Sequence, residues 1–97
     1  MVNAAAIHNK LVKTHINSIL TAIARASHYK VNSVEFNVLL RSVRSDYDLL
    51  MISTSDSEFS KLEKQITDKV RNYYSPEVES KVLTVFADCK SFWANMR

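Results

Sequence analysis

Glycine is absent from this sequence, and Pro76 is the single proline. Glycine supplies the positive φ angles that tight hairpins, phosphate-binding loops and nucleophile elbows require. Phosphate-binding loops and dinucleotide fingerprints cannot be written without it, so nucleotide binding of those kinds is excluded. Helices lose nothing by this absence, which favours an all-α fold.

Cysteine and long apolar runs are also scarce. Because Cys89 is the only cysteine, no disulfide can form within the chain, and we expect a reducing, cytoplasmic environment. The short apolar start of the chain precedes its first basic residues, which is the reverse of the order in a signal peptide. No apolar run approaches the roughly 18 residues of a membrane span, so we expect a soluble protein with no membrane partner.

The length of 97 residues, 46% of them apolar, suits one core. Chains of this size usually form a single domain and can fold without a metal ion or a disulfide. We therefore expect residues 1–97 to form one helical domain that holds no metal and no cofactor.

Polar capping residues and the proline mark where helices begin. Ser55 with Glu58 matches the capping box, and so does Asn32 with Glu35. Pro76 suits the first position of a helix. The chain is thus predicted to fold as an all-α, single-domain antiparallel helical bundle of about four helices, which span roughly 4–27, 33–52, 56–74 and 76–96.

Apolar residues recur at helical spacing in each segment and define the expected core. In the third segment the stripe comprises Phe59, Leu62, Ile66, Val70 and Tyr73. In the fourth segment it comprises Val78, Val82, Val85, Cys89, Phe92 and Met96. Residues 49–52 could alternatively form a short strand, but the chain shows no second alternating run to pair with it.

The second segment has a further apolar line on the side away from its main core face. This line is our candidate partner-binding surface and comprises Val34, Val38, Leu49 and Ile52. Apolar residues on both sides of a helix indicate either deep burial in the monomer or contact with a partner. The partner could be another protein or a second copy in a homodimer.

Positive charge is concentrated in residues 1–31, which contain four basic residues, no acidic residue and all three histidines. A helical wheel places most of its polar and basic side chains opposite the core stripe. Our candidate residues for nucleic-acid or acidic-partner binding are Lys10, Lys13, Asn17, Arg25, His28 and Lys30. An ordinary solvated helix face would show the same pattern, since the charge density is modest.

A degenerate helix-turn-helix can be drawn across residues 24–38, with Ala24 and Val34 at the small and apolar positions that the motif needs. The match is incomplete. Ser27 and Asn37 occupy positions that usually hold large apolar side chains.

No arrangement of nucleophile, base and orienting acid emerges from the sequence. His8 and His15 are seven residues apart, whereas metal-binding pairs on helices are three or four apart, so we expect structural roles for both. Cys89 lies inside the apolar stripe of the fourth segment and is expected to be a buried apolar group. The protein is therefore predicted to have no catalytic residues and not to be an enzyme.

These observations favour a non-catalytic helical interaction module, such as a small regulator, adaptor or inhibitor that docks on another protein. The alternative is a nucleic-acid-binding protein that uses the basic face of the first helix or the degenerate helix-turn-helix.

Overall fold

The computed structural model describes residues 4–96, which form four helices and no strand within that range. These are α1 (Ala4–Ala26), α2 (Val34–Ser53), α3 (Asp56–Tyr73) and α4 (Pro76–Asn95). The predicted all-α four-helix bundle is confirmed, and every predicted boundary that falls in this range lies within one residue of the observed one. Residues 49–52 belong to α2 and are helical.

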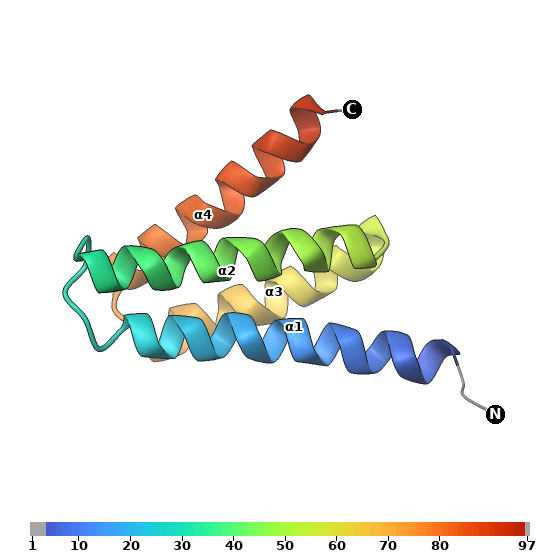
Figure 1. The fold of residues 1–97 in the computed structure, drawn as a ribbon, viewed down its shortest axis with the longest axis horizontal. Coiled ribbons are helices and arrows are strands. Elements are labelled where there is room, and N and C mark those ends of the chain that lie inside the picture. The colour runs from blue at the N-terminus through green and yellow to red at the C-terminus, as the bar shows by residue number, and fades with distance from the viewer. Residues whose placement is uncertain (1–3, 97) are drawn as a thin grey trace.

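The helices pack around α2, which contacts each of the other three. Figure 1 shows α1 and α2 lying side by side and antiparallel, with α3 behind them. α4 is inclined to the other three helices, and its C-terminal end rises away from them in this view (Figure 1). The described chain measures 47 × 31 × 22 Å along its principal axes.

An aromatic cluster around Tyr47 of α2 forms the centre of the core. The ring of Tyr47 stacks on Phe86 of α4, with centroids 4.3 Å apart and planes 9° apart. Phe59 of α3 meets the same ring edge-on at 5.2 Å. Such aromatic contacts add to the hydrophobic gain of burial, and here they tie three helices to one side chain.

The predicted core stripes hold for most positions and fail at three, which lie at the C-terminal ends of α3 and α4. In α3, Tyr73 is 77% exposed and Tyr74 instead packs against the core. In α4 the stripe is buried or half-buried from Val78 to Cys89, but Phe92 and Met96 are exposed. The physical reason is the inclination of α4, whose last turns rise away from the other helices and remain linked to them through Trp93, which reaches Asp48 of α2.

Serine side chains cap three of the helices. Ser55 Oγ accepts a hydrogen bond from the backbone N–H of Glu58 at the start of α3. Ser75 Oγ does the same for Val78 at the start of α4, and Pro76 takes the first helical position as predicted.

The cap of α2 differs from the prediction by one residue. Ser33, not Asn32, has extended backbone geometry and accepts the hydrogen bond from the N–H of Phe36. Asn32 has a φ angle of 68°, in the left-handed region, whereas a helix N-cap residue typically has extended backbone geometry. In a chain without glycine, asparagine is one of the few residues that enters this region at low cost.

We expect Asn32→Ala to lower the free energy of unfolding by about 1 kcal/mol, because alanine lacks the short polar side chain whose local hydrogen bonds let asparagine adopt a left-handed backbone. Asn32→Gly should retain or slightly raise stability, since glycine adopts that φ freely. Urea denaturation followed by circular dichroism measures both variants. Equal unfolding midpoints for the two variants would contradict the left-handed geometry.

Candidate interaction surface

Four apolar side chains of α2 lie outside the core that the monomer builds. Their exposed fractions are 76% for Val34, 53% for Val38, 46% for Leu49 and 63% for Ile52. The core-facing side of the same helix is fully buried at Phe36, Val43, Tyr47 and Leu50. α2 is thus covered by its neighbours on one side and open on the other, and we call the four exposed residues the α2 outer face.

The α2 outer face has apolar ends and a polar middle. Helical periodicity places Arg41 and Ser45, both exposed, between the pair Val34 and Val38 and the pair Leu49 and Ile52. At 1.5 Å per residue, the two apolar ends are about 16 Å apart along the helix.

An open groove with a volume of about 540 Å³ lies at the N-terminal end of this face. Its residues come from the end of α1, the connection that follows and the start of α2. They are Arg25, His28, Tyr29, Val34, Glu35, Val38 and Leu39. We call it the α1–α2 groove.

This groove brings together residues that the sequence predicts in two separate candidate sets. Val34 and Val38 come from the apolar line, while Arg25 and His28 come from the basic set. Tyr29 and Leu39 were not predicted as site residues, and they reach the groove only because α1 and α2 fold back on each other.

The predicted basic residues do not form one compact cluster on the surface. All six members of the basic set are exposed, but Lys10 and Arg25 are about 22 Å apart along α1 at 1.5 Å per residue. A second, polar groove of about 420 Å³ runs between α1 and α2 and includes Asn17 and Arg25, together with Asp46 of α2. The basic residues therefore form a sparse row along α1.

Residues 24–38 do not have the geometry of a helix-turn-helix. That motif joins two helices at a steep angle through three or four residues. Here the connection comprises the seven residues 27–33, and α1 and α2 run antiparallel (Figure 1). The long connection lets the two helices pack along their lengths, so neither projects as a separate recognition helix.

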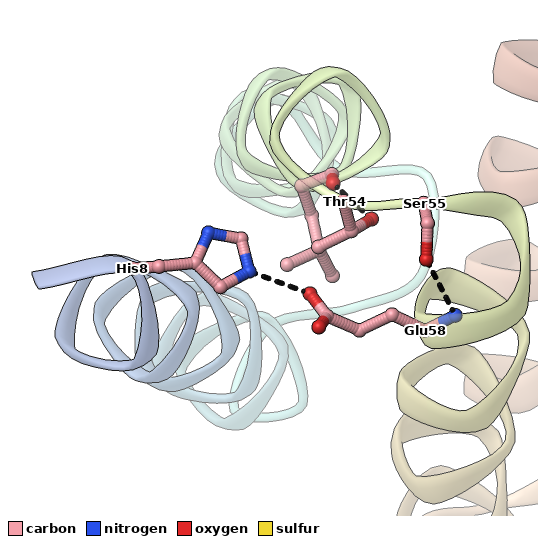
Figure 2. A network of polar contacts seen from close by, with 5 residues as sticks. His8, Thr54, Ser55 and Glu58 are labelled. Carbon is pink, nitrogen blue, oxygen red and sulfur yellow. Dashed lines mark hydrogen bonds and ion pairs between the residues drawn. The ribbon is translucent and has the colours of Figure 1, made fainter. Parts of the chain in front are cut away.

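Both predicted structural histidines contact a carboxylate on another helix. His8 Nε2 lies 2.8 Å from Glu58 Oε1 at the start of α3, next to the Ser55 cap (Figure 2). His15 Nδ1 lies 3.6 Å from Asp46 Oδ1 of α2. Among residues 4–96, no three histidine, cysteine or acidic side chains gather in a way that could hold a metal ion.

Hydrogen bonds between polar side chains link α2, α3 and α4. Tyr47 donates its hydroxyl hydrogen bond to Glu63, whose other oxygen accepts from Lys90 Nζ at 2.7 Å. Burial, reinforced by the bond to Glu63, raises the pKa of Tyr47 above its ordinary value of 10.0. Trp93 Nε1 donates to Asp48 at 3.0 Å and anchors the end of α4.

Cys89 is fully buried, as the sequence predicts. Burial, helped by the nearby Asp48 carboxylate, raises the pKa of its thiol from 9.0 to about 11. A reactive cysteine instead has a lowered pKa and partial exposure. Cys89 therefore packs as an apolar group and is not an activated nucleophile.

No known protein family matches the sequence, and comparison with curated proteins and with solved structures also finds no match. None of the described helices is both long and apolar enough to cross a membrane. The side chains of the α1–α2 groove offer an apolar surface next to a basic edge.

We expect the protein to lose stability as the pH rises above 9. In the unfolded chain Cys89 ionises near pH 9, whereas in the folded protein its pKa is about 11. The unfolded state therefore binds fewer protons in that window, and Cys89 alone should cost about 1 kcal/mol at pH 10. The raised pKa of Tyr47 acts in the same direction.

Thermal denaturation at pH 7.5 and pH 10 tests this expectation, with Cys89→Val as the matched variant of similar volume. The variant should lose less stability than the natural protein between the two pH values. An identical loss in both proteins would show that Cys89 ionises equally in the folded and unfolded states.

Proposed function

We propose that this protein is a non-catalytic helical interaction module, a small regulator, adaptor or inhibitor that docks on another protein chain through the α2 outer face and the α1–α2 groove. The observation that carries the proposal is the exposure of Val34, Val38, Leu49 and Ile52 on a helix whose opposite side forms the centre of the core. Exposed apolar side chains with polar neighbours are typical of protein-binding surfaces.

A partner that covers the α2 outer face would remove its apolar side chains from water. Removing one valine or isoleucine side chain from water contributes about 1.5–3 kcal/mol. Interfaces concentrate their binding energy in a few well-covered side chains near the centre of the contact. Val34 and Val38, which line the α1–α2 groove, are positioned for such a role once a partner covers them.

The contacts inside the bundle support a non-catalytic role. Tyr47 and Glu63 are hydrogen-bonded to each other, Glu63 also binds Lys90, and Cys89 is buried with a raised pKa. Among the described residues, no buried side-chain nitrogen or oxygen lacks a hydrogen-bond partner. Catalytic groups, in contrast, are commonly exposed to a cleft and poised with a shifted pKa near the working pH.

A second candidate function is binding of nucleic acid along α1. The observation in its favour is the exposed set Lys10, Lys13, Arg25 and Lys30 in a stretch of 31 residues without an acidic side chain. These cations could each contact a phosphate. Their wide spacing predicts few simultaneous contacts and weak binding.

The proposed docking function predicts the positions at which a photo-reactive amino acid will cross-link to a partner protein. We expect benzoylphenylalanine at position 38 or 52 to form adducts with one specific protein chain in extracts of the natural source. That chain can be a different protein or a second copy of this one. The same group at Tyr73 of α3, which is more exposed than Val38 or Ile52, is the control and should form none. Adducts of equal yield at all three positions, or none at any, would refute docking through this face.

The nucleic-acid alternative predicts steep dependence on salt. Fluorescence anisotropy with a random-sequence DNA or RNA pool should show binding at 50 mM salt that weakens about 10-fold or more by 200 mM. The double variant Lys10→Glu, Lys13→Glu should weaken it further. Absence of binding at 50 mM, or binding unchanged at 200 mM, removes this alternative.

A further inference from the structure

We propose that the partner of the α2 outer face is a second copy of this chain, packed so that α2 of one copy runs antiparallel to α2 of the other. This inference rests on the proposed function, because it names the partner of the same surface. The observations behind it are the spacing of the exposed residues along α2, the shape of the α1–α2 groove and the position of Arg41 in the middle of the face.

The exposed apolar residues are spaced symmetrically about the middle of α2. Val34 lies nine residues before Val43, and Ile52 lies nine residues after it. Val38 lies five residues before and Leu49 six residues after. A two-fold axis level with Val43 therefore places Val34 against Ile52 of the other copy and Val38 against Leu49, so that apolar groups meet at both ends.

The polar middle of the face decides between antiparallel and parallel packing. Arg41 lies two residues before Val43 and Ser45 two residues after it, so the antiparallel arrangement sets each arginine near the serine hydroxyl of the other copy. A parallel arrangement would set Arg41 against Arg41, and like charges brought together in an interface are unfavourable. The antiparallel packing avoids this repulsion.

The α1–α2 groove accommodates the apolar end of the other copy. In the antiparallel packing Ile52 approaches Val34, which lines the groove together with Tyr29 and Val38. An open, mainly apolar groove of about 540 Å³ has room for a branched aliphatic side chain. Ile52, which is 63% exposed in the single chain, would be covered there.

The charges at the two ends of α2 are mixed. Beside its N-terminal end lie Arg25, His28 and Lys30, together with Glu35 in the first turn of the helix. Beside its C-terminal end lies the first turn of α3, where Glu58 is paired with His8 of α1. The apolar spacing and the position of Arg41 therefore carry the choice of antiparallel packing.

The available area indicates a reversible dimer. α2 has 20 residues, so its outer face is about 30 Å long and about 10 Å wide. Two apolar patches of the usual 300–600 Å² bury roughly 600–1,200 Å² in total, which is at or below the lower limit of stable interfaces. We therefore expect a dissociation constant on the order of 10 μM, with monomer and dimer in exchange.

The test uses the full chain in sedimentation equilibrium or light scattering between about 1 and 500 μM, bracketing the expected dissociation constant. The natural protein should pass from monomer to dimer over this range. Val38→Glu alone and Leu49→Lys alone should each weaken dimerisation at least about 30-fold, because each puts an unpaired charge against an apolar group at both ends.

An equimolar mixture of the two variants tests the register. In the mixed dimer the introduced glutamate faces the introduced lysine at one end, and the natural Val38 and Leu49 meet at the other. We expect this mixture to form a dimer within about 5-fold of the natural affinity. Tyr73→Glu, on the exposed side of α3, is the matched control and should dimerise normally. Circular dichroism verifies that each variant is folded.

A natural protein that stays monomeric at 500 μM overturns the inference, and so do variants that dimerise as well as it does. A mixture that remains monomeric while the natural protein dimerises overturns the antiparallel register. The proposed function fails separately. If the chain is monomeric but positions 38 and 52 cross-link to a different protein, the dimer is refuted and the docking function stands. If neither position forms a specific adduct with any chain, the dimer and the docking function both fail.

Discussion

The packing of Tyr47 against the aromatic rings of α3 and α4 is the contact on which the arrangement of this protein depends. Its ring is covered by Phe86 on one face and by Phe59 at an edge, and its hydroxyl binds Glu63. Because one face of α2 is committed to these contacts, and α1 packs along another side of the same helix, the remaining side is left without a neighbour. The open apolar surface of α2 is thus a consequence of where Tyr47 points.

Half-buried polar side chains link the helices of this bundle to one another. The intermediate positions here hold His8, His15, Asp48, Glu63 and Trp93, and each contacts a side chain of another helix. These polar links fix how the helices sit against one another.

The helix boundaries could be predicted from sequence because capping and helix breaking depend on residues within one turn. Ser55 and Pro76 act locally, and the structure uses them as expected. The Asn32 assignment was wrong by one position because Asn32 and Ser33 are both good caps, and only the path of the connection decides which of them adopts the left-handed backbone. Periodicity predicted the apolar stripe of α4, but whether Phe92 has a neighbour depends on the inclination of the whole helix.

The candidate surface could be predicted in part, because helical periodicity depends only on local sequence. The line of Val34, Val38, Leu49 and Ile52 follows from helical spacing, while its exposure depends on which neighbours cover α2. The α1–α2 groove could not be derived, because Tyr29 and Arg25 meet Val38 only after the connection folds back. Residues distant in sequence become neighbours through tertiary packing, and no local pattern encodes that.

The inclined end of α4 has a consequence for how the fold opens. Beyond Cys89 the helix keeps two polar links to the bundle, from Lys90 to Glu63 and from Trp93 to Asp48, while Phe92 and Met96 face water. The segment with the fewest buried contacts costs least to detach, so the backbone amides of these last turns should exchange with solvent long before those around Tyr47. Local unfolding should therefore begin at the C-terminal turns of α4 and proceed toward its N-terminal end, and the aromatic contacts around Tyr47 should open last.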